Sequence, residues 1–129
     1  MSFFSGVYQI NVRVKEIKKA VQWYEDKLGL QVLKNYGKTV VLGQDGGIPV
    51  CLIEKPPHQP IPDNLEGTHP VFCISSRSVE DCKKGLIDRG VIVLDGGSEG
   101  HFKFRDLDGN LLEAYLPGLY EEDRFEVYR

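Results

Sequence analysis

A single carboxylate interrupts the apolar end of the stretch FRDLDGNLLEAY, residues 104–115. Glu113 follows Leu111 and Leu112 and precedes Ala114, in a segment whose composition is typical of a strand that enters a core. A carboxylate in a low-dielectric environment is costly unless it protonates, finds a partner or binds a cation. Glu113 is therefore the first candidate for chemistry, both as a metal ligand and as a catalytic group that moves a proton.

Two more polar side chains occur in strands of similar pattern. Alternation along 7–14 places Gln9 on the polar face of one predicted strand, and His69 begins another. Together with Glu113 they offer an amide oxygen, an imidazole nitrogen and a carboxylate oxygen. This set suits a divalent metal ion with positions left open for water or substrate. The sequence predicts metal binding by these three residues and does not distinguish between Zn, Ni, Mn, Co and Fe.

The elements that must position these residues occur twice along the chain. Each half is expected to run strand, helix and three strands, and an offset of about sixty residues superimposes the halves. The expected elements of the first half are a strand at 7–14, a helix at 17–28 ended by Gly29, and strands near 30–36, 39–43 and 48–54. Those of the second half are a strand at 69–75, a helix between Ser78 and Gly90, and strands at 91–94, 101–105 and 110–116.

This repeat predicts an α+β fold of two tandem βαβββ modules that form a curved mixed sheet around a cleft. Module one is expected at about 5–54 and module two at about 68–117 of a single domain. A proline-rich connector, 55–67, separates the modules, and a tail, 118–129, follows them. We expect the tail to pack over the cleft mouth or a partner subunit, or to be an ordinary terminus.

The faces of the strands that the helices do not cover are expected to line the cleft. Besides the three predicted ligands, the side chains assigned to it are Asn11, Arg13, Cys51, Val71, Cys73 and Tyr115. His101, where the predicted strand 101–105 starts, could face the cleft, but a surface loop is the favoured expectation. The run from Asp106 to Asn110 is explained by a hairpin turn better than by a calcium loop.

Composition excludes several classes of protein. A net charge of −3, with acidic and basic residues interspersed, gives no indication of nucleic-acid binding. No apolar run approaches the length of a membrane span, so no membrane association and a cytoplasmic location are expected. The three cysteines are odd in number and lie among apolar neighbours, which favours reduced, packed thiols.

Several of these segments resemble the vicinal oxygen chelate superfamily, the glyoxalase, bleomycin-resistance and extradiol dioxygenase group. The segments are 9–14, 20–24, 28–30 and the F-x-D-x-D-G-N-x-x-E signature at 104–113. The resemblance implies paired βαβββ modules, a small-molecule substrate or ligand and a homodimer. It also implies metal ligands from the first strand of each half and the last strand of the chain, which are Gln9, His69 and Glu113 here.

Two departures from the family pattern limit what the resemblance implies. Glyoxalase-type members carry a fourth ligand on the last strand of the first half. The sixty-residue offset from Glu113 leads there to Ile53, or to Cys51 if a gap shifts the register by two, and neither is an oxygen ligand. Glu54 is nearby but faces the opposite side of the strand. Gln9 stands where the ring-cleaving dioxygenases have a second histidine, which weakens the iron-oxygenase interpretation.

The leading functional prediction is a glyoxalase-like, metal-dependent lyase or isomerase that acts on a small carbonyl or hydroxy compound. The alternatives are a metal-free protein that sequesters a small molecule, as in bleomycin resistance, and a thiol transferase or dioxygenase of the same superfamily. Thiol transfer to an epoxide antibiotic ranks lower because 95–100 has no basic residue for a phosphonate.

Overall fold

The structure, a computed structural model, describes residues 2–44, 46–60, 67–75 and 78–117. The chain divides into two compact units, Met1–Pro62 and Asp63–Arg129. The predicted tail at 118–129 and the connector residues 61–66 lie outside the described residues. In the described part of the chain, no helix is long and apolar enough to span a membrane.

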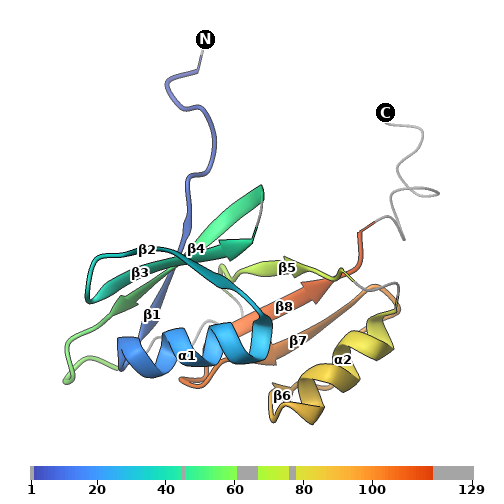
Figure 1. The fold of residues 1–129 in the computed structure, drawn as a ribbon. Helices are drawn as coiled ribbons and strands as arrows, with labels where there is room; N and C mark the ends of the chain where they lie inside the picture. Colours follow the sequence, from blue (N-terminus) through green and yellow to red (C-terminus); the bar gives the residue numbers. More distant parts are fainter. Residues whose placement is uncertain (1, 45, 61–66, 76–77, 118–129) are drawn as a thin grey trace. The chain divides into compact units, whose positions relative to one another are not determined.

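Each unit contains one four-stranded mixed sheet and one helix (Figure 1). The elements of the first are β1 (Ile10–Val14), α1 (Ile17–Leu28), β2 (Gln31–Asn35), β3 (Thr39–Gln44) and β4 (Gly46–Glu54). Those of the second are β5 (Val71–Cys73), α2 (Val79–Asp88), β6 (Ile92–Val93), β7 (His101–Arg105) and β8 (Leu111–Tyr115). The strand orders, β1-β4-β3-β2 and β5-β8-β7-β6, are equivalent, which confirms the predicted pair of βαβββ modules.

In both units the first strand pairs in parallel with the last, and the other pairings are antiparallel. A side chain at the start of a module is thereby brought beside a side chain near its end. This topology, and not closeness in sequence, positions the candidate residues of each unit.

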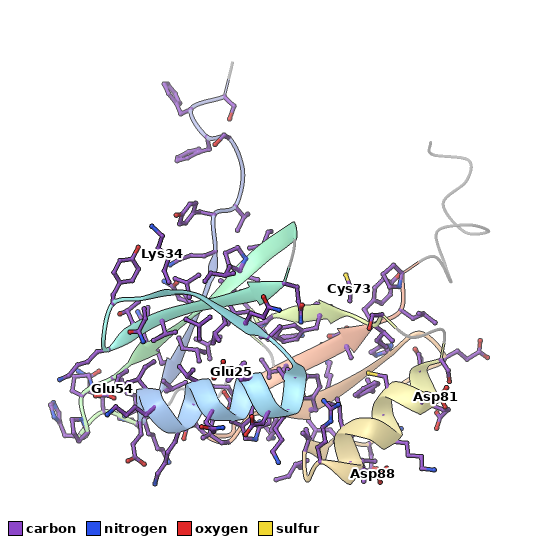
Figure 2. The ribbon with its side chains drawn as sticks, viewed as in Figure 1. Glu25, Lys34, Glu54, Cys73, Asp81 and Asp88 are labelled. Atoms are coloured by element: carbon purple, nitrogen blue, oxygen red, sulfur yellow. The ribbon has the colours of Figure 1, made fainter. Side chains whose placement is uncertain are left out.

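Helix α1 matches its predicted bounds, and the two ends are held in different ways. Gly29 ends it in the left-handed conformation (φ 73°), which glycine adopts without a Cβ clash. At the start, the N-cap residue Glu16 makes no side-chain cap, and the Glu54 Oε2 atom of β4 accepts a 2.9 Å hydrogen bond from the Ile17 N–H (Figure 2). Glu54 thus faces the helix, as its strand parity predicts.

The core of each unit follows the predicted alternation. Val14, Leu42 and Leu52 are fully buried in the first unit, whereas Asn11 and Arg13 on the other face of β1 are exposed. In the second unit Phe102, Phe104 and Leu112 are fully buried on the core face, and Leu111, which shares the other face of β8 with Glu113, is fully buried as well. Burial of these apolar faces leaves the opposite face of each sheet for function.

Three sequence predictions need correction. The first strand begins at Ile10 and the fifth at Val71, so Gln9 and His69 precede their strands instead of lying within them. His101 begins β7 and is not in a loop. Cys73 is exposed and not packed, because it lies on the open face of β5, an edge strand of its sheet (Figure 2).

Candidate metal and substrate site

His69 and Glu113 form a direct contact on the open face of the second unit. The His69 Nε2 and Glu113 Oε1 atoms are 2.9 Å apart, and both side chains are largely shielded, with 16% and 18% of their surface exposed. The register explains the contact, because Val71 of β5 is paired with Glu113 of β8 and His69 lies two residues earlier on the same face. Glu113 therefore has the partner that its position requires.

The turn that leads into β8 is held by a second, buried carboxylate. Asp106 Oδ1 accepts hydrogen bonds of 2.9 Å from the Asp108 and Asn110 N–H groups, and Oδ2 accepts one of 2.9 Å from Asn110 Nδ2. Gly109 adopts a φ of 86° in this turn. Most of the signature between Phe104 and Glu113 is thus a hairpin that fixes where Glu113 emerges, in agreement with the predicted turn.

Basic residues flank Glu113 on the same face of the sheet. Lys103 of β7 is paired with Glu113, and Arg105 is paired with Leu111. Phe102 and Phe104 alternate with them and are buried. From the sequence, Lys103 and Arg105, with Arg13 and Tyr115, are candidate anchors for an anionic substrate, although a solvent-exposed position is favoured for each. The alternation HFKFR places Lys103 and Arg105 on this polar face.

A comparable pair exists in the first unit. Gln9 Nε2 donates a 2.8 Å hydrogen bond to Asn11 Oδ1, and Gln9 also hydrogen-bonds the Cys51 thiol. Asn11 is paired with Cys51 as Val71 is with Glu113, so Cys51, and not Ile53, is the counterpart of Glu113. The first module has an amide and a thiol where the second has an imidazole and a carboxylate.

The electrostatics of Cys51 disfavour its thiolate. Burial raises the pKa of Cys51, and the opposing effects of the Gln9 hydrogen bond and of the Arg13 charge are smaller. Because metals bind the thiolate form of cysteine, this thiol is a poor substitute for the carboxylate of the second module.

The predicted site residues thus fall into two sets. His69, Val71, Cys73, Glu113 and Tyr115 share the open face of the second unit, and Gln9, Asn11, Arg13 and Cys51 belong to the first. Among the described residues, no three His, Cys, Asp or Glu side chains are clustered as a metal site. Gln9 as a third ligand stays a prediction.

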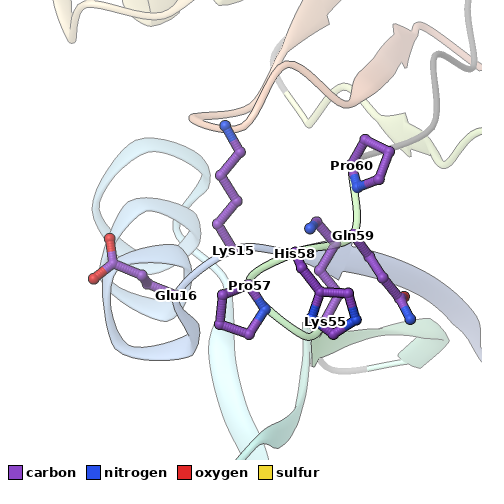
Figure 3. A pocket seen from close by; sticks show the side chains of 7 residues that line it. All are labelled: Lys15, Glu16, Lys55, Pro57, His58, Gln59 and Pro60. Carbon is purple, nitrogen blue, oxygen red and sulfur yellow. The ribbon is translucent and has the colours of Figure 1, made fainter.

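A pocket in the first unit is separate from these residues (Figure 3). It is lined by Lys15, Glu16, Lys55, Pro57, His58, Gln59 and Pro60, which come from the end of β1, the start of α1 and the connector. Lys55 is 7% exposed and donates a 3.3 Å hydrogen bond to the Pro56 carbonyl. None of the predicted site residues lines this pocket.

The geometry of His69 and Glu113 fits a metal ion. Two ligand atoms about 2.1 Å from a metal and about 90° apart are separated by about 3.0 Å, close to the observed distance. His69 Nδ1 lies 3.1 Å from the Gly67 carbonyl oxygen, and a proton on Nδ1 donated to that oxygen would leave the Nε2 lone pair for a metal ion. An imidazole nitrogen and a carboxylate oxygen suit borderline and hard divalent ions.

Comparisons with curated proteins find metallothiol transferases. The chain is 31% identical to "Metallothiol transferase FosB" of Staphylococcus epidermidis over 129 residues, which cover 96% of this chain and 91% of the relative. The protein of the same name from Staphylococcus haemolyticus (strain JCSC1435) is 30% identical with the same coverage.

Solved structures with a similar fold include an antibiotic binding protein and a fosfomycin resistance protein. The antibiotic binding protein TnmS3 of Streptomyces sp. CB03234 has a TM-score of 0.72 at 23% identity, covering 92% of this chain and 100% of that one. The E126Q mutant of the fosfomycin resistance protein FosX of Listeria monocytogenes, complexed with Mn(II) and 1S,2S-dihydroxypropylphosphonic acid, has a TM-score of 0.68 at 20% identity. That match covers 98% of this chain and 100% of FosX.

A family model matches residues 6–114, from before β1 to Ala114 in β8. The matched region includes both modules, the His69–Glu113 pair and the hairpin signature. The chain belongs to the glyoxalase/bleomycin resistance protein/dioxygenase superfamily.

Proposed function

We propose that this protein is a metal-dependent thiol transferase that opens a small epoxide bearing an anionic group such as a phosphonate. The observation that carries the proposal is the His69–Glu113 pair, with 2.9 Å between its ligand atoms, beside Lys103 on the same face. The curated relatives favour this alternative over the lyase or isomerase that sequence analysis ranked first.

His69 and Glu113 are proposed as metal ligands, with Gln9 as the predicted third. A divalent ion held there would act as a Lewis acid and polarise the epoxide oxygen. The His69 Nε2 atom and one Glu113 carboxylate oxygen would hold the ion, and His69 Nδ1 is next to the Gly67 carbonyl. Of these two ligands only the carboxylate is charged, so together they contribute one formal negative charge.

The charge of the surrounding face supports an anionic substrate. Lys103 is paired with Glu113 and Arg105 lies two residues further along β7, so two cationic side chains are close to the proposed ligands. Arg105 also donates a 2.8 Å hydrogen bond to the Gly109 carbonyl, which holds the guanidinium near the turn. A phosphonate accepts charge-assisted hydrogen bonds from such groups.

The test combines metal analysis with a thiol-transfer assay. The purified protein is loaded with Mn²⁺, and conjugation of L-cysteine to fosfomycin is followed by mass spectrometry of the product. We expect one metal ion per chain and a conjugate whose formation stops after chelation. Metal-loaded protein that forms no conjugate would contradict the proposal. The control variant Glu99→Gln, which removes an exposed carboxylate of the same unit, should bind metal and form the conjugate as wild type does.

A metal-free binding protein is the second candidate, because the fold is shared with an antibiotic binding protein. The exposed Val71 and the half-buried Tyr115 give the open face apolar surface for such a ligand. Calorimetry separates the candidates: ligand binding that survives chelation, without turnover, would favour sequestration over catalysis.

A further inference from the structure

The turn before β7 holds the ring of His101 in a defined orientation. Ser98 Oγ lies 2.6 Å from His101 Nδ1 and accepts a 3.2 Å hydrogen bond from the Gly100 N–H. The Ser98 N–H also donates a 2.9 Å hydrogen bond to the His101 carbonyl. Gly97 allows this close approach, because a Cβ there would lie 2.7 Å from the His101 carbonyl oxygen.

His101 is on the same face as the proposed metal ligands. It is paired with Tyr115, two residues beyond Glu113, and the next residue, Phe102, is buried on the opposite face. His101 and Glu113 are therefore a diagonal pair on adjacent antiparallel strands, and the Cα atoms of such a pair are roughly 7–8 Å apart. A small substrate bound beside Glu113 would be within reach of the imidazole.

We propose that His101, oriented by Ser98, is the group that accepts the thiol proton in the reaction catalysed on this face. The inference rests on the proposed function and adds a residue for which the sequence favoured a surface loop over a position facing the cleft.

The two histidines of this face differ in which ring nitrogens are engaged. Both nitrogens of His69 have partners, Gly67 and Glu113. In His101 the Nδ1 atom has Ser98, and no described residue hydrogen-bonds Nε2. A neutral imidazole whose Nδ1–H donates to Ser98 Oγ leaves the Nε2 lone pair to accept a proton.

The chemical step balances with this single proton acceptor. Nε2 takes the proton from the thiol, the sulfur forms a bond to an epoxide carbon, and the carbon–oxygen bond breaks with its electron pair on oxygen. The imidazolium or solvent then returns the proton to that oxygen. The thiol and the epoxide are the only reactants required.

The other titratable groups on this face suit the role less well. They are His69, Cys73, Lys103, Arg105, Glu113 and Tyr115, with Glu99 in the preceding turn. Lysine, arginine and tyrosine ordinarily stay protonated at neutral pH, and carboxylates are weak bases there. Histidine is the side chain most often used as a general base, and of the two histidines on this face His69 has both ring nitrogens engaged.

The experiment measures kcat/KM against pH for Mn²⁺-loaded wild type, His101→Gln and His58→Gln, with L-cysteine and fosfomycin. His58, in the connector of the other unit, is the matched control. We expect His101→Gln to lower kcat/KM by about 10²–10⁴-fold and to abolish the acidic limb, with metal content unchanged. The control variant should retain both the rate and the limb.

Two additional variants separate orientation from folding. Ser98→Ala should lower kcat and shift the NMR titration of the His101 ring, whereas Ser98→Thr, which keeps the hydroxyl, should restore both. Matching circular dichroism spectra would show that the variants are folded.

The outcomes distinguish this inference from the proposed function. Wild type that binds no metal or forms no conjugate would overturn the proposed function and the role of His101 with it. Active wild type accompanied by a His101→Gln variant of equal kcat/KM and unchanged pH profile would overturn the inference alone.

Discussion

His69 and Glu113 are 44 residues apart in the chain, and their side chains meet at 2.9 Å. The parallel pairing of β5 with β8 produces this contact, and the buried hairpin at Asp106 fixes where β8 begins. Residues from the two ends of one module are thereby combined into a pair of potential metal ligands.

Replacing Glu113 by Gln should weaken metal binding. The amide keeps the shape of the side chain and removes its charge. Because losing even an outer-sphere partner lowers metal affinity about 10–100-fold, we expect the loss of a direct ligand to lower Mn²⁺ affinity at least about 100-fold. Mn²⁺ titration calorimetry measures the effect, with Glu99→Gln as the exposed control. Equal Mn²⁺ affinity in Glu113→Gln and wild type would remove Glu113 from the proposed site.

Lys103→Gln should impair recognition of an anionic substrate. Lys103 is paired with Glu113, so its charge lies beside the proposed ligands, and loss of one charge-assisted hydrogen bond costs about 1.5–3 kcal/mol. We expect KM for fosfomycin to rise more than kcat falls. Lys84→Gln, at an exposed position of α2, should behave as wild type. An unchanged KM in Lys103→Gln would contradict an anion-binding role.

Asp106→Ala should destabilise the second unit by about 3 kcal/mol, because it removes a buried carboxylate that accepts several hydrogen bonds. Urea unfolding measures the change in the free energy of unfolding. Asp95→Ala, which alters an exposed carboxylate, should stay within about 0.5 kcal/mol of wild type. A similarly small change for Asp106→Ala would show that the hairpin does not depend on its carboxylate.

Glu54→Ala should destabilise the first unit by about 1 kcal/mol, the usual cost of losing an N-terminal helix cap. Glu54→Gln, which keeps an acceptor oxygen and loses the charge near the helix N-terminus, should cost about 0.5 kcal/mol. Thermal unfolding of both variants, with Glu25→Ala on the exposed side of α1 as control, checks the order. The reverse order would indicate that Glu54 acts in another way.

The three cysteines should react with iodoacetamide in the order of their exposure. Cys73 is exposed and should be modified first, whereas Cys51 is 1% exposed and should be modified last. Burial also raises the pKa of Cys51 and of Cys82, so less thiolate is present at a given pH and their alkylation should accelerate only at more alkaline pH. Peptide mapping by mass spectrometry reads each site, and early modification of Cys51 would contradict its burial.

Much of the fold could be predicted from local sequence pattern. The spacing of Ile17, Ala20 and Tyr24 predicted helix α1 and its buried face, and the repeat predicted two modules of the same topology. Strand alternation correctly assigned Glu54 to the helix side and Glu113 to the open side. These features could be predicted because the periods of helix and strand are fixed, so the order of residues along the chain decides which side chains share a face.

Other features depended on pairing between distant segments. Only the register shows that Cys51, and not Ile53, is the counterpart of Glu113, because a local offset of two residues is invisible in sequence alternation. The same is true of Lys103 beside Glu113 and of Ser98 beside His101. The sequence by itself determined which face each side chain takes, whereas the tertiary structure decided which side chains meet, because strand register is set by long-range packing and turn geometry.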